Sequence, residues 1–382
     1  MKAIKNGTPI YVEPYKEPKV WGVKGIGEYW YGAEKGEKSS VISGQGGKVR
    51  LCDVVAAAPG LVLGEKVVKK YGHFLPLTKI LTPKGRLSMQ FHDAKNELWV
   101  VTGIDKKSAG KTPSLIIGFN PRMIKKYGSG IKKEYRKALE EFGSDLNALI
   151  DGLEKSGYGK QLDKEKDVIK AAQKVKGKAD IKRLLASLLV SKKKVESFYN
   201  VLKVKIGDVI PVPQGTLHAL GAGIEIIEPQ IAGPTQSLED GATYPVRYYF
   251  PDYPRAGASK KLDLDRVGEM CSKIWKMEKP GVVKKTAYIK VERLPGGFEK
   301  KGMAVHRVTM SGRARTEYRD VKSYHVLVAV KGPAFVACGG KNYRIPQASA
   351  DGKMLIMPVS CGSFDVYSEK GAQFLDIFTP VE

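Results

Sequence analysis

The sequence predicts a mainly β fold interrupted by an α-helical insertion. Short runs of β-branched and other apolar residues, separated by glycine and proline, recur at both ends of the chain. Between about residues 119 and 205, apolar residues recur at helical spacing instead. A hydrophobic fraction of 42% is ordinary for a globular chain, and 382 residues suffice for two or three domains. Wholesale disorder is therefore excluded.

The first 118 residues are predicted to form short strands and turns. The run VISGQGGKVRLCDVVAA and the stretches 86–91 and 97–102 contain many residues that favour strands. Strand character returns at Val201, where VLKVKIGDVIPVPQGTLHALG alternates apolar residues with glycine and proline turns. We expect a helix-prone, basic linker over residues 262–285. Beyond it, phrases such as YHVLVAV and KMLIMPVS again predict short strands.

Three helices are predicted within residues 119–200. Ser144 is expected to cap a helix that contains Leu146, Leu149 and Leu153 on one face. Asp180 precedes a second run with the same periodicity. A third helix is expected between them, at about residues 168–172.

Positive charge dominates the composition, with 65 Lys and Arg against 40 Asp and Glu and a formal net charge of +25. About +11 of this charge lies in residues 119–205, where lysines alternate with an apolar helical face. No helix-turn-helix spacing, zinc-finger pattern or RNP-like aromatic phrase accompanies the charge. We therefore predict a solvated surface and no nucleic-acid partner.

Membrane insertion and secretion are not expected. The longest apolar stretches fall far below the roughly 18 residues that a membrane span needs, and the N-terminal residues contain no apolar segment typical of a signal peptide. Four scattered cysteines form no C-x-x-C pair, which favours a reducing cytoplasm over a disulfide scaffold or a cysteine zinc site. They are Cys52, Cys271, Cys338 and Cys361.

Four polar residues together indicate a metal site. Gln90 and His92 occupy alternate positions of a predicted strand, so both project from the same face. Glu97 follows after a short turn, and His218 follows a turn that Pro213 and its neighbouring glycine fix. Two imidazole nitrogens, a carboxylate and an amide oxygen suit Zn²⁺ and leave a further position for water or substrate.

These motifs resemble the cupin fold. The second cupin motif, G-x5-P-x-G-x2-H, is met by Gly207, Pro213, Gly215 and His218, and the first is met with Gln90 in place of its first histidine. The Gln-x-His pair with KNELWVV, PLTKIL, VWG and IGEYW is similar to the class I phosphomannose isomerases. The resemblance extends over about residues 20–255, and more loosely to the end of the chain.

This resemblance implies two cupin-type (jelly-roll) β-barrels. The N-terminal, metal-binding barrel would comprise residues 1–118 and 201–260, with residues 119–200 as a helical insertion. Residues 261–382 would form a linker and a C-terminal cupin-like barrel. The resemblance also implies one zinc ion per chain, held by Gln90, His92, Glu97 and His218. The implied activity is aldose–ketose isomerisation of mannose 6-phosphate and fructose 6-phosphate through a cis-enediol.

Further site residues follow from the same resemblance. Lys95 matches a lysine beside the metal, and three pocket residues would bind substrate: Lys79, Ser88 and Glu228. Arg247 matches the arginine that stabilises negative charge. Because this chain has extra residues after Glu228, Arg255 is the alternative. The group that moves the proton stays open among Lys95, Glu228 and a zinc-bound water.

Two alternatives to the predicted activity remain. Only DA separates His92 from Lys95, which is shorter than usual in the family and reshapes one wall of the pocket. One alternative is therefore an isomerase of another sugar phosphate, such as glucose 6-phosphate. The other, from a different class, is a non-catalytic cupin that binds a sugar or a regulatory partner. For the predicted enzyme, the expected partner is a small-molecule sugar phosphate and the expected location is the cytoplasm. The oligomeric state is not predicted.

Overall fold

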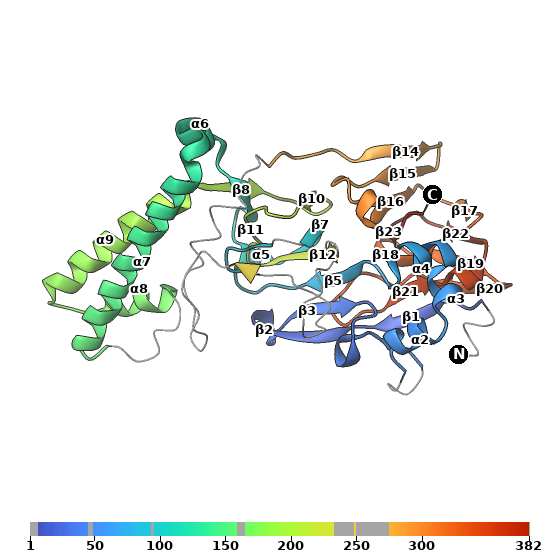
Figure 1. Cartoon of the computed structure of the whole chain (residues 1–382), viewed down its shortest axis with the longest axis horizontal. Helices are drawn as coiled ribbons and strands as arrows, with labels where there is room; N and C mark the ends of the chain where they lie inside the picture. The colour runs from blue at the N-terminus through green and yellow to red at the C-terminus, as the bar shows by residue number, and fades with distance from the viewer. Residues whose placement is uncertain are drawn as a thin grey trace.

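A computed structural model describes residues 7–44, 49–92, 95–158, 165–232, 248–249 and 275–381. The protein is mainly β with helices, which confirms the predicted fold class at this level. Figure 1 shows a bundle of helices at one end, the C-terminal strands at the other, and the remaining sheets between them. The recorded strand pairings form open sheets, and they do not confirm two closed barrels among the described residues.

A six-stranded antiparallel sheet forms the centre of the molecule. Its order is β10 (Val209–Val212), β7 (Lys95–Ile104), β12 (Ile224–Ala232), β5 (Leu77–Leu81), β3 (Ile26–Tyr31) and β2 (Tyr15–Val23). A three-stranded sheet orders β11 (His218–Ala219), β8 (Ser114–Phe119) and β9 (Tyr199–Lys203). A short pair joins β6 (Phe91–His92) to β13 (Tyr248–Tyr249). Strands from before and after the helical residues therefore pair with each other.

The two faces of the six-stranded sheet lie in different environments. One face carries Ile80, Leu98 and Ile227 into the largest apolar core, which also includes residues of the C-terminal sheet. The opposite face carries Trp99 and Ile226 into a core shared with Leu115 and Ile117 of β8. Because side chains alternate along a strand, Lys95 and Glu97, which lie four and two positions before Trp99 on β7, also lie on this second face.

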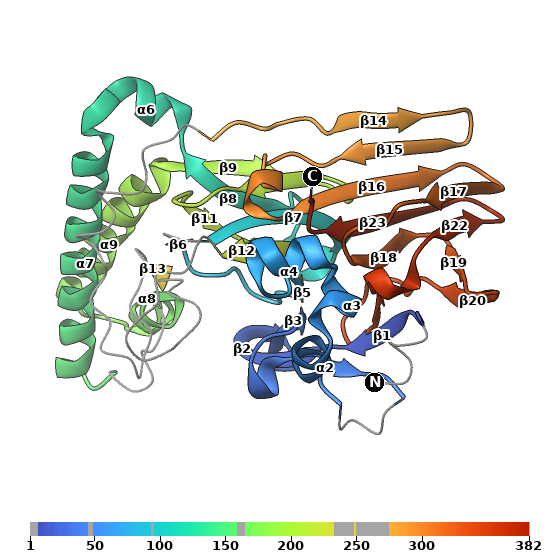
Figure 2. The same cartoon turned by 45° about the vertical axis from the view of Figure 1, so that its right-hand side comes forward.

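Three short helices follow β4 (Val41–Ile42), where the sequence predicts mostly strands and turns. They are α2 (Leu51–Ala57), α3 (Pro59–Leu63) and α4 (Glu65–Tyr71). Figure 2 shows them in front of the junction between the central and C-terminal sheets. Their buried residues belong to the largest core, so these helices cover the region where the two groups of strands meet.

The helical bundle contains α6 (Pro121–Tyr127), α7 (Ile131–Lys155), α8 (Glu165–Lys174) and α9 (Ala179–Ser197). The helices predicted around residues 168–172 and after Asp180 are confirmed, but the cap at Ser144 is wrong. Ser144 lies inside α7, which is continuous because Phe142 and Leu146 both pack into the core of the bundle. None of the described helices is long and apolar enough to cross a membrane. One further short helix, α5 (Lys106–Ala109), precedes β8.

The C-terminal strands form two sheets with an apolar core between them. The larger orders β14 (Gly281–Lys285), β15 (Ile289–Arg293), β16 (Ala304–Met310), β23 (Ala372–Phe378), β18 (His325–Lys331), β21 (Met354–Met357), β1 (Ile10–Glu13) and β4. The smaller orders β17 (Ala314–Tyr318), β22 (Phe364–Ser368), β19 (Phe335–Cys338) and β20 (Lys341–Arg344). The end of the predicted helix-prone linker is therefore strand β14. The N-terminal strands β1 and β4 complete the larger sheet.

Candidate metal centre

Short backbone pairings bring the predicted ligands of the two motifs together. Gln90 and His218 form an antiparallel bridge in which each backbone N–H donates to the other residue's carbonyl, at 2.9 and 2.8 Å. The turn before His218 is closed by the N–H of Gly215, which donates to the carbonyl of His92 at 2.7 Å. Gly215 has a φ of +77°, a conformation that favours glycine. The glycine of the second motif therefore places one ligand strand against the other.

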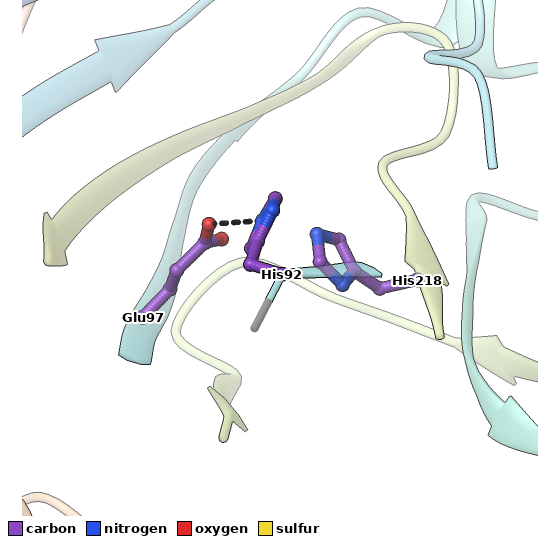
Figure 3. Close-up of side chains that lie close together, drawn as sticks. All are labelled: His92, Glu97 and His218. Carbon is purple, nitrogen blue, oxygen red and sulfur yellow. Dashed lines mark ion pairs between the residues drawn. The ribbon is translucent and has the colours of Figure 1, made fainter. Parts of the chain in front are cut away.

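His92, Glu97 and His218 form a buried cluster whose ligand atoms all lie within 4.8 Å of one another. Figure 3 shows the imidazole of His92 between the other two side chains. Nε2 of His92 lies 2.9 Å from Oε1 of Glu97. Nδ1 of His218 lies 2.7 Å from the carbonyl of Thr216, so Nδ1 carries the proton and donates it. Nε2 of His218 is then an acceptor that has no hydrogen-bond partner within the described part of the chain.

The protonation states of this cluster suit a cation. Burial lowers the pKa of His92 to about 3, against the opposing charge of Glu97, and burial also lowers the pKa of His218. Burial alone would raise the pKa of Glu97, but the ammonium group of Lys95 and the two histidines hold that pKa well below its usual value. Neutral imidazoles and an ionised carboxylate are the forms that bind a metal. The donor set therefore fits a Zn²⁺ ion.

A lysine and a second carboxylate lie directly beside the cluster. Nζ of Lys95 lies 2.5 Å from Oε1 of Glu97 and 3.2 Å from Oε1 of Glu228. Burial, and then the charge of Glu97, raise the pKa of Glu228 to about 7, while Lys95 and Lys79 oppose the rise. A carboxyl group with a pKa near neutrality can both accept and donate a proton, as acid–base catalysis requires.

Lys79 lies on the neighbouring strand β5, where its backbone pairs with Glu228. Its ammonium group lies 3.2 Å from Oε2 of Glu28 and 4.5 Å from the centre of the Trp30 ring. The indole N–H of Trp30 also donates to Oε2 of Glu28, at 2.8 Å. Neither Glu28 nor Trp30 is among the predicted site residues, although both belong to the phrase IGEYW. Because Trp30 pairs with Lys79, and Lys79 with Glu228, these three side chains line the same face of the sheet.

The remaining predicted residues divide into two groups. Ser88 and Gln90 are partly buried and lie just before His92 in the chain, between the buried Leu87, Met89 and Phe91. Arg247 and its alternative, Arg255, lie outside the described residues.

A family description matches part of the chain. Residues 11–110 match the family model "Phosphomannose isomerase type I, catalytic domain". This segment contains the first ligand motif and Lys79, Lys95 and Glu97. No curated protein sequence matches the chain significantly.

Solved structures resemble the whole chain. A mannose 6-phosphate isomerase from Bacillus subtilis is 16% identical with a TM-score of 0.60, over 97% of this chain and 99% of that one. A mutant phosphomannose isomerase from Salmonella typhimurium is 15% identical with a TM-score of 0.60, over 98% and 100%. A zinc-bound mannose 6-phosphate isomerase has the same identity and TM-score, over 98% and 99%. At such identity the likeness establishes a shared fold. Together with the match over residues 11–110, it supports the family predicted from the motifs, the type I phosphomannose isomerases.

Proposed function

We propose that this protein is a zinc-dependent aldose–ketose isomerase that interconverts mannose 6-phosphate and fructose 6-phosphate through a cis-enediol. The observation that carries the proposal is the buried cluster of His92, Glu97 and His218, beside which Lys95 contacts both Glu97 and Glu228. Such an isomerisation moves one proton between carbons 1 and 2. It therefore needs a proton-transfer group next to a centre that stabilises negative charge on oxygen.

One zinc ion per chain would be held by Gln90, His92, Glu97 and His218. Nε2 of His218 has no hydrogen-bond partner among the described residues, and this supports the assignment, since a buried acceptor without a donor is costly unless a ligand satisfies it. When bound, zinc supplies Lewis-acid polarisation of the carbonyl and hydroxyl oxygens of the open-chain sugar. Gln90 would contribute an amide oxygen from the strand segment that pairs with His218.

Glu228 would transfer the proton between the two carbons, and Lys95 would position Glu228. Glu228 has a pKa near 7, so its carboxylate can take the proton from one carbon and return it to the other. The ammonium of Lys95 lies between Glu97 and Glu228 and would hold the Glu228 carboxylate in place. Lys79 and Ser88 would bind the substrate, and Arg247 or Arg255 would stabilise negative charge on the enediolate or the phosphate.

We also propose the domain organisation that the family resemblance implies. Two cupin-type barrels would comprise residues 1–118 with 201–260, and residues 261–382 including the linker, with residues 119–200 inserted between the halves of the first. Pairing of β7 and β5 with β10 and β12 across the helical residues supports the first unit. The expected location remains the cytoplasm.

The experiment measures zinc content and mannose 6-phosphate turnover of the zinc-loaded wild type, of His218→Ala and of the control His73→Ala. His73 is exposed and distant in sequence from both motifs. We expect His218→Ala to lose zinc and at least 100-fold of the activity together, whereas His73→Ala keeps both. Retained activity in His218→Ala, or a wild type without turnover, would refute the proposal. Turnover of glucose 6-phosphate in place of mannose 6-phosphate would instead support the other sugar-phosphate substrate.

A further inference from the structure

Gln230 is a polar residue of the site face that neither the motifs nor the proposed mechanism uses. It lies on β12, two residues after Glu228, so both side chains project from the same face of the sheet. Its backbone pairs with Glu97 of β7 on one side and with Leu77 of β5 on the other. Directly paired residues have Cβ atoms only about 4.5–5.5 Å apart. The side chain of Gln230 therefore lies beside that of the proposed zinc ligand Glu97.

The amide oxygen of Gln230 has an unusual environment. Oε1 is buried from solvent and has no hydrogen-bond partner among the residues that the structure describes. Leaving a buried acceptor unpaired costs about 1–3 kcal/mol, and most buried polar groups avoid this cost. The unpaired amide oxygen of Gln230, beside a proposed metal ligand, is explained if a bound molecule donates the hydrogen bond.

The chemistry of that donor follows from the neighbours. Glu97 and Glu228 are acceptors when ionised, and Lys95 already lies between them. A neutral amide oxygen next to these groups suits a neutral hydroxyl group, because it can accept the hydroxyl proton without adding charge to the site. An open-chain sugar phosphate offers several such hydroxyl groups close to its reacting carbons.

We infer that Gln230 is a substrate-binding residue whose Oε1 accepts a hydrogen bond from a hydroxyl group of the open-chain sugar phosphate. The inference rests on the proposed function and extends it, since it assigns a contact to a residue outside the predicted ligand and substrate set. It also separates the two glutamines of the site. Gln90 would bind the metal and Gln230 the sugar.

The test compares Gln230→Met, which keeps the length of the side chain but removes the amide, with Gln373→Met. Gln373 lies on β23 in the C-terminal sheet and donates to Thr309 at 3.0 Å, so it controls for the substitution itself. The measurements are the Kd of mannitol 1-phosphate, which is the reduced open-chain form of mannose 6-phosphate, and the KM for mannose 6-phosphate. Zinc content and the thermal midpoint are recorded for the same samples.

We expect Gln230→Met to raise the Kd and the KM about tenfold, as for one lost hydrogen bond. Zinc should stay at one ion per chain, and the thermal midpoint should stay the same or rise, because a buried unpaired acceptor has been removed. Gln373→Met should leave the Kd unchanged. An unchanged Kd in Gln230→Met would overturn the inference, and so would a fall in its thermal midpoint, since the amide would then be bonded within the protein. A wild type that binds mannitol 1-phosphate but does not isomerise mannose 6-phosphate would refute the proposed function alone.

Discussion

Trp99→Phe tests whether the surroundings of the ligands set the affinity for zinc. Trp99 is 1% exposed, and its indole N–H donates to Oε2 of Glu97 at 2.8 Å. Phenylalanine would keep an aromatic ring against His218, whose ring centre lies 5.4 Å away, but would remove the donor. Hydrogen bonds to ligating carboxylates orient them, and losing one typically costs 10–100-fold in metal affinity. We therefore expect zinc to bind about 10–100-fold more weakly, which corresponds to about 1.4–2.8 kcal/mol.

The assay is competition for zinc between the protein and a chromophoric chelator of known affinity. The matched control is Trp275→Phe, because the indole N–H of Trp275 donates at 2.8 Å to the carbonyl of Pro211, and its ring packs against the same core as Trp99. That variant loses an indole hydrogen bond of the same length without touching a proposed ligand. Equal losses of zinc affinity in the two variants, or no loss in Trp99→Phe, would show that the hydrogen bond to Glu97 does not orient the ligand.

Two further predictions concern stability. The charges of Lys79 and Lys19 outweigh burial and lower the pKa of Glu28 to about 2, so its stabilising effect is present above about pH 4.5 and is lost as the pH falls towards 2. Urea unfolding of the zinc-free protein should show Glu28→Gln less stable by about 3 kcal/mol at pH 7, with a smaller deficit at pH 3; an equal deficit at both pH values would contradict this. Leu139→Ala should destabilise the helical bundle by about 2–5 kcal/mol, because Leu139 is fully buried there, and should leave zinc content unchanged. Zinc loss in the folded Leu139→Ala variant would show that the bundle supports the metal site.

The sequence predicts the strands and helices that carry a clear periodicity, and it fails where packing decides. The helices α2, α3 and α4 have only five to seven residues each, too few for a helical period to be visible, and they are stable because they cover the largest core. The error at Ser144 has a similar cause. A serine after Gly143 reads as a helix start, but burial of Phe142 and Leu146 on one face keeps α7 continuous for 25 residues.

Some residues of the candidate site could be predicted from the sequence, and others could not. His92, Glu97 and His218 belong to motifs of fixed spacing, and the structure brings these three together as the spacing predicts. Gln230 belongs to no such motif. Its place beside Glu97 depends on the register of β12 against β7, which pairs residues 133 positions apart in the chain. Single-sequence patterns do not specify the register of distant strands, because the partners are set only when the sheet assembles.

The charge at the site differs from the net charge of the chain, because few of the basic residues are buried. Of all the lysines and arginines that the structure describes, only Lys79 and Lys95 are buried, and both lie on the site face. Three carboxylates, Glu28, Glu97 and ionised Glu228, surround these two ammonium groups. The partly exposed Lys19 adds a third ammonium group, 3.6 Å from Oε1 of Glu28, so the described charges of the site come close to balancing. The whole chain, by contrast, carries a net charge of +25. The proposed zinc ion would thus add the positive charge that attracts an anionic sugar phosphate to the site.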